Sequence, residues 1–154
     1  MDRVEEILRS AERRLRGVEP GTAEQIDELE KLVGRPLPRE LRAYLRLAGG
    51  SPGNLTFQQT HKAIRPTLSD AIANHRPMRH GRRKNRKKPA STIFFGDGDG
   101  GCQDCGAAFL VLDSEELPRV EIDPEDPPVA GFDYDELVLL EPRFSDYVRR
   151  ALPT

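Results

Sequence analysis

The stretch Ile93–Asp113 reads IFFGDGDGGCQDCGAAFLVLD and decides the fold. It contains two apolar runs, Ile93–Phe95 and Ala107–Leu112, joined by a loop of glycine, aspartate and cysteine. Runs of β-branched and aromatic residues bounded by turn residues are typical of a strand-turn-strand unit. We therefore predict two neighbouring core strands, against which the other elements bury their apolar faces.

Amphipathic helices are predicted on the N-terminal side of these strands. Apolar residues recur at intervals of three and four within residues 3–16, 26–33 and 41–48, which is the period of a helix with one buried face. Thr22 and Gln25 have the spacing of a capping box at the start of the second helix. A shorter helix is predicted over residues 67–76, with Leu68, Ala71 and Ile72 facing inward.

Further strands and a closing helix are predicted after the central pair. Residues 119–122 and 136–140 have strand-like composition, and residues 144–151 have apolar residues at helical spacing. Helices first, then strands, then a helix predict an α+β fold with an antiparallel or mixed sheet, not alternating βαβ units. A length of 154 residues suits a single domain over residues 1–154.

The composition indicates the cellular compartment in which the protein is expected. No run approaches the ~18 apolar residues of a membrane span. The first residues are charged throughout and lack the apolar core of a secretory signal. Two cysteines do not make a disulfide framework. We expect a cytoplasmic protein that makes no contact with membranes.

Charge is strongly segregated along the chain. Residues 79–88, RHGRRKNRKK, carry seven basic and no acidic residues, whereas residues 89–154 carry 15 acidic and four basic residues. A run without apolar residues is predicted to be a solvated, flexible insertion. It could contact phosphates, but it has no aromatic residue for base stacking, so nucleic acid is not the expected partner.

Removal of the basic insertion is expected to leave the fold intact. Residues 79–88 contain no apolar residue, so a chain that lacks them loses nothing from the core. Thermal unfolding of the deletion variant should give the same melting temperature as the full chain within a few degrees. A large drop would contradict the prediction.

The glycine loop formally fits a nucleotide-binding fingerprint, with Gly96, Gly98 and Gly101 at the right spacing. That fingerprint needs a helix next, whose N-terminal amides hold the pyrophosphate. A strand is predicted here, so the glycines indicate a tight turn. No nucleophile–histidine–acid arrangement stands out, and we predict that the protein is not an enzyme.

The pair Cys102-x-x-Cys105 could supply half of a tetrahedral zinc site. His75 and His80 have a spacing that could supply the other half. A redox pair is disfavoured because the pair does not open a helix in a βαβ unit. The remaining interpretation is two cysteines in a loop without a metal, and no cofactor is expected.

Several segments resemble one family in order and spacing. The stretch TAEQIDELEKLVGRPLPRELRAYLRLAGG, residues 22–50, is similar to the opening signature of the SUKH superfamily (Smi/Knr type). The positions that carry the resemblance there are Ile26, Leu29, Glu30, Gly34, Leu37, Pro38, Leu45, Gly49 and Gly50. Later matches are Gly96, Asp97, Gly100, Gly101, Phe109, Val111, Asp113 and the helix Phe144–Val148.

The resemblance implies a binding protein without catalytic residues. SUKH members are known mainly as bacterial immunity proteins that bind and block a toxin domain, often a nuclease, and some are regulatory scaffolds. The expected function is therefore occlusion of a cognate toxin. The first alternative is a regulatory or scaffold module, and the second is a zinc- or nucleic-acid-binding protein. The toxin's identity and the oligomeric state remain open.

The acidic half of the chain suggests where a toxin would bind. A nuclease must be basic to hold phosphates, and an inhibitor can present carboxylates to that surface. Loops on a rigid sheet are common recognition sites. The candidate residues lie in the glycine loop and after the following strand, and they are Asp97, Asp99, Asp104, Asp113, Glu115 and Glu116.

Overall fold

The structure is a computed structural model, and it describes residues 2–58, 63–64, 66–75, 92–97, 107–113, 117–133 and 136–154. Its helices are α1 (Arg3–Ser10), α2 (Ala23–Val33), α3 (Arg39–Ala48), α4 (Leu68–His75) and α5 (Phe144–Arg150), with a 3₁₀ turn at Glu12–Arg14. The basic insertion 79–88 lies outside the described residues. The predicted order of helices, strands and a closing helix is confirmed.

The largest sheet has four antiparallel strands in the order β5-β6-β7-β8. These are β5 (Thr92–Asp97), β6 (Ala107–Val111), β7 (Val129–Asp133) and β8 (Glu136–Glu141). Two small antiparallel pairs join β1 (Val18–Glu19) to β2 (Ser51–Pro52) and β3 (Phe57–Gln58) to β4 (Ala63–Ile64). The α+β prediction is confirmed, and every strand pair in the described residues is antiparallel.

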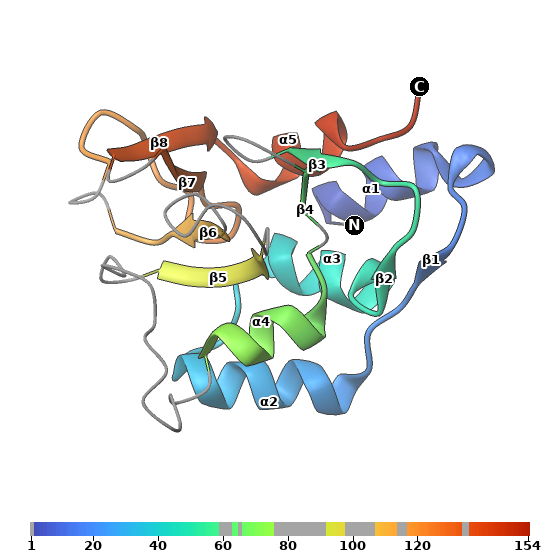
Figure 1. Ribbon diagram of the computed structural model, residues 1–154, viewed down its shortest axis with the longest axis horizontal. Helices are drawn as coiled ribbons and strands as arrows, with labels where there is room; N and C mark the ends of the chain where they lie inside the picture. Colours follow the sequence, from blue (N-terminus) through green and yellow to red (C-terminus); the bar gives the residue numbers. More distant parts are fainter. Residues whose placement is uncertain are drawn as a thin grey trace.

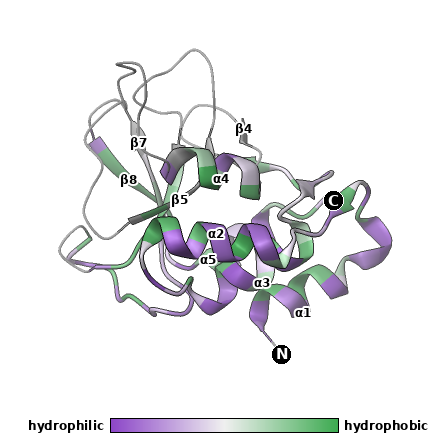
Figure 2. Ribbon diagram, turned by 90° about the horizontal axis from the view of Figure 1, so that it is seen from below, coloured by the Kyte–Doolittle hydropathy of each residue, from purple (hydrophilic) through white to green (hydrophobic). Residues whose placement is uncertain are grey.

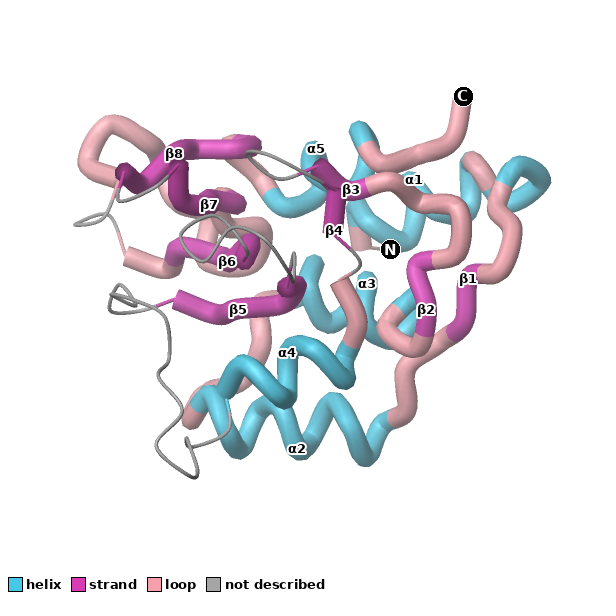
Figure 3. The backbone as a smooth tube through the Cα atoms, in the orientation of Figure 1, coloured by secondary structure: helices cyan, strands magenta, loops and turns pink. Residues whose placement is uncertain are grey.

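The predicted central pair of strands forms the β5–β6 hairpin. Ile93 pairs with Leu110, and Phe94 pairs with Phe109. In Figure 3 the four-stranded sheet lies apart from most of the helices. Helix α4 lies next to β5, and α2 lies beyond α4 (Figure 1). Because successive side chains of a strand point to opposite faces of the sheet, alternate residues of β5 and β6 have different neighbours.

The main core lies between the sheet and the helices. Ile93, Leu110 and Val129 enter it from the sheet, and Tyr44 enters it from α3. The Tyr44 ring makes edge-on contacts with Phe57 and Phe144, with ring centroids 5.6 and 5.8 Å apart. Its hydroxyl donates a hydrogen bond to the Pro66 carbonyl at 2.8 Å. Figure 2 shows the alternation of apolar and polar residues along α1 and α2 that places one face of each helix against this core.

A second, smaller apolar cluster lies on the other face of the sheet. Phe109, Val111 and Ala130 form it, and Leu117 and Ile122 pack against it from the following loop. Residues 119–122 are therefore not the predicted strand. Pro118 provides no amide hydrogen for a ladder, and Val120 N–H closes a turn onto the Leu117 carbonyl at 3.0 Å instead.

Two other boundaries differ from the prediction. Helix α1 ends at Ser10 and does not extend to residue 16. The Ser10 hydroxyl donates to the Ile7 carbonyl at 2.7 Å, a side-chain bond that competes with continued helix formation. Strand β7 was not predicted, because Gly131 and Asp133 weaken its strand-like composition.

Candidate partner-binding surface

The structure places Asp97 and Asp113 at opposite ends of the β5–β6 hairpin. Asp97 is the last residue of β5 and pairs with Ala107 at the start of β6. Asp113 is half-buried and follows the far end of β6, beside the start of β5. A five-residue strand spans about 13 Å from its first residue to its last. The sheet therefore does not bring these two candidate acids together.

The other acidic candidates, Asp99, Asp104, Glu115 and Glu116, lie outside the described residues. Asp99 and Asp104 belong to the connection that begins after Asp97, and Glu115 and Glu116 belong to the connection that begins after Asp113. The chain order thus divides the six candidates into two groups, Asp97 with Asp99 and Asp104, and Asp113 with Glu115 and Glu116.

The zinc hypothesis rests mainly on residues beyond the described ranges. His75 is the last residue of α4 and is half-buried. His80, Cys102 and Cys105 are not among the described residues. In the described part of the chain, no three His, Cys, Asp or Glu side chains are grouped as metal ligands would be. The zinc site therefore stays an untested alternative to the expectation of no cofactor.

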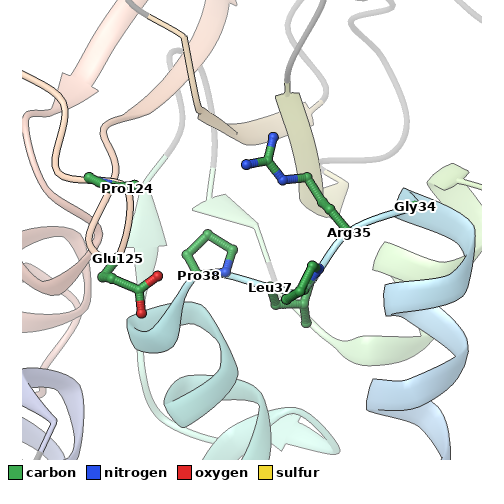
Figure 4. Close-up of a pocket in the computed structure, with 7 residues that line it drawn as sticks. Gly34, Arg35, Leu37, Pro38, Pro124 and Glu125 are labelled. Carbon is green, nitrogen blue, oxygen red and sulfur yellow. The ribbon is translucent and has the colours of Figure 1, made fainter.

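A surface hollow of about 510 Å³ lies between the α2–α3 turn and the loop that precedes β7 (Figure 4). The residues that line it are Gly34, Arg35, Pro36, Leu37, Pro38, Pro124 and Glu125. Arg35 extends over the hollow from one side, and Glu125 and Pro124 face it from the other, with the Pro38 ring between them (Figure 4).

The first wall of the hollow is fixed by the end of α2. Gly34 ends that helix with a φ of 85°, a left-handed conformation that glycine adopts without strain. The Glu30 carboxylate accepts a hydrogen bond from the Leu37 amide at 2.8 Å and pairs with Arg42 of α3. The turn 34–38 is thus held to both helices that it connects.

The second wall is fixed by hydrogen bonds from distant elements. The Glu125 carbonyl accepts from the Glu40 amide, at the start of α3, at 3.0 Å. Next to it, Asp126 is fully buried and accepts from the Ser145 amide at 2.8 Å and from the Ser145 hydroxyl at 2.6 Å. The loop is therefore tied to α3 on one side and to the first turn of α5 on the other.

Arg3 and Glu40 connect this loop to α1. The Arg3 guanidinium donates to Asp126 at 3.0 Å, and this hydrogen bond raises the pKa of Arg3. Glu40 is fully buried and accepts from the Val4 amide at 2.8 Å. A carboxylate at a helix N-terminus satisfies amides that have no partner within the helix. Glu40 therefore acts as the N-cap acceptor of α1, although it belongs to α3.

Sequence reasoning missed the hollow. Pro36, Pro38 and the acidic Pro-rich segment around Pro124 are visible as turn signals. No pattern in the sequence links residues 34–38 to residues 124–125, which meet only because α3 and the loop before β7 pack together. A fully buried acid in a polar loop, such as Asp126, also has no local signature.

Comparison with known proteins matches the chain to a family. The model of the SMI1 / KNR4 family (SUKH-1) matches residues 20–150, which include both walls of the hollow and the β5–β6 hairpin. Neither the curated proteins nor the solved structures yielded a match. Among the described residues, every helix is too short or too polar to cross a bilayer.

Proposed function

Because this chain belongs to the SMI1 / KNR4 family (SUKH-1), we propose that it is an immunity protein that neutralises a cognate bacterial toxin. It binds the toxin domain and covers the surface that the toxin needs, without turning over a substrate. The observation that carries the proposal is the family match over residues 20–150. Inhibition takes place in the cytoplasm, where a nuclease toxin meets its nucleic-acid substrate.

The charge distribution supports a basic toxin surface as the target. Residues 89–154 carry 15 acidic and four basic residues, and a nuclease domain needs cations to hold phosphates. Complementary charge accelerates the encounter and favours the correct partner. Asp97 and Asp99, around the start of the glycine loop, are our first choice of contact residues.

The function is tested by affinity capture of the full chain from its own cells, followed by mass spectrometry. We expect one stoichiometric partner with a C-terminal toxin domain, and co-expression of the chain should rescue cells that express that domain. Capture of several regulatory proteins without a toxin would contradict the proposal and favour the scaffold alternative.

The acidic contact is tested by charge reversal. The double substitution Asp97→Lys and Asp99→Lys is expected to weaken toxin binding by at least about tenfold, mainly through a slower association rate. The control is Glu24→Lys with Asp27→Lys, which makes the same charge change at exposed positions of α2. Equal affinity of the two double variants, measured by calorimetry, would remove the glycine loop from the interface.

A further inference from the structure

We propose that the hollow between residues 34–38 and residues 124–125 receives a tyrosine or tryptophan side chain of the protein partner. This inference rests on the proposed function for the identity of the partner, but it concerns one contact that can be measured without the partner. It follows from the rigid, partly apolar lining of the hollow and from two charged side chains at its sides.

Part of the hollow's lining is rigid and apolar. Three of its lining residues, Pro36, Pro38 and Pro124, are prolines, whose rings fix the backbone φ angle. Leu37 is buried beneath them with 4% of its surface exposed. A ring-shaped side chain can lie on such a surface at a small entropic cost, because an aromatic side chain has only two rotatable bonds.

Two opposite charges flank this apolar surface. In the described part of the chain, neither the Arg35 guanidinium nor the Glu125 carboxylate has an ion-pair or hydrogen-bond partner. Both line the hollow, and both extend from its rim toward the space between them (Figure 4). Other exposed arginines nearby are paired, as Arg39 is with Asp2 at 3.3 Å. The pair Arg35 and Glu125 is thus available to an occupant.

These features select among the possible occupants. A leucine or phenylalanine would desolvate Glu125 without giving its carboxylate a donor, which costs binding free energy. A lysine or arginine side chain would be repelled by Arg35, and an aspartate or glutamate side chain would be repelled by Glu125. A phenol O–H or an indole N–H can donate to Glu125 while the ring faces Arg35, an arrangement in which the cation is attracted to the aromatic face. Tyrosine and tryptophan each provide a hydrogen-bond donor for Glu125, carry no charge that Arg35 or Glu125 would repel, and offer an aromatic face to Arg35.

The hollow is also held in shape before a partner arrives. Leu37 is bonded to Glu30, and Glu125 is bonded through its carbonyl to the Glu40 amide. A preformed pocket for an aromatic anchor is the usual geometry of an interface hot spot. Binding therefore orders the partner's aromatic side chain but requires no rearrangement of the residues that line the hollow.

The probes for the test are p-cresol and 3-methylindole, which are the side chains of tyrosine and tryptophan, with n-propylguanidinium as the arginine analogue. In ¹⁵N-resolved NMR titrations of the full chain, we expect the two aromatic probes to shift the amide signals of Arg35, Leu37 and Glu125 saturably, with a Kd on the order of 1 mM. Glu125→Ala and Arg35→Ala should each raise that Kd about fivefold or more.

The matched control is Glu121→Ala, which removes an exposed acid from the same loop outside the hollow. It should leave the Kd of p-cresol unchanged, and unchanged signals from α2 and α5 will show that every variant is folded. Shifts confined to other residues, tighter binding of n-propylguanidinium than of p-cresol, or equal Kd values for the Glu125 and Glu121 variants would each overturn the inference.

The captured partner then separates this inference from the proposed function. Arg35→Ala with Glu125→Ala is expected to weaken the partner complex by at least about tenfold. A toxin that binds this double variant and the unmodified chain equally would overturn the inference and leave the proposed function in place. Aromatic probes that bind the hollow when no toxin is captured would support the inference and overturn the function.

Discussion

Replacement of Asp126 by alanine is expected to lower the free energy of unfolding by about 3–5 kcal/mol. The carboxylate is fully buried and accepts from the amide and the hydroxyl of Ser145, which is itself 3% exposed. Without Asp126, both donors remain in the interior with no acceptor, and each costs about 1–3 kcal/mol. The first turn of α5 also loses the negative charge that its dipole favours.

The measurement is urea unfolding followed by circular dichroism. The matched control is Asp123→Ala, which removes an acid of the same loop whose side chain is 37% exposed and 3.6 Å from the same arginine, and which accepts from the Glu125 amide at 3.0 Å. Because exposed ion pairs and exposed hydrogen bonds contribute little, this control should lose only about 1 kcal/mol. Equal losses for the two variants would show that burial of Asp126 does not stabilise α5.

Substitution of Gly53 by alanine is expected to be as damaging, with a loss of about 3–5 kcal/mol. Gly53 has a φ of 56°, and a Cβ atom there would lie 2.1 Å from the Arg16 carbonyl oxygen. That oxygen also accepts a hydrogen bond from the Asn54 amide at 2.9 Å. The backbone on both sides would have to move apart, which would disturb the β1–β2 pair next to it.

Gly34 provides a control for the effect of backbone conformation alone. It has a φ of 85°, and a Cβ atom there would have no atom within 4 Å. Gly34→Ala should therefore cost only the strain of a left-handed residue, about 1–2 kcal/mol. Thermal unfolding of both variants separates the two contributions, and a Gly53→Ala variant no less stable than Gly34→Ala would mean that the close contact relaxes without cost.

The local features of the fold could be predicted from the sequence because they depend on neighbouring residues. The spacing of Leu41, Tyr44, Leu45 and Ala48 predicts one buried face of a helix, and all four are fully buried in α3. Thr22 was predicted to cap α2, and its side chain accepts from the Gln25 amide at 3.1 Å. Periodicity and capping act over a single turn, so the sequence displays them directly.

The features that position the candidate hollow depend on residues far apart. Glu40 caps α1 from a position 36 residues away, and Asp126 reaches Arg3 across 123 residues. Neither acid stands out in the sequence from the other charged residues around it. Local composition cannot distinguish a solvated acid from one that tertiary packing buries, because the difference comes only from what packs against it.

The arrangement of the candidate acidic residues also could not be predicted from local sequence. Asp97 and Asp113 are separated by 15 residues in a stretch that the sequence predicts as one unit. An antiparallel hairpin places the residues after its second strand at the open end, away from the turn. Asp97 and Asp113 are therefore two separate starting points for mutagenesis.

The contacts of α1 with Asp126 and α5 have a consequence for biosynthesis. Arg3 needs Asp126, and α1 packs against α5. At a synthesis rate of about 5–20 residues per second, the ribosome needs roughly 6–25 s to add the 123 residues that follow Arg3, up to and including Asp126. During that time Val4, Ile7 and Leu8 lack part of their final packing. The apolar face of nascent α1 therefore stays incompletely covered until synthesis has passed Arg150, the last residue of α5.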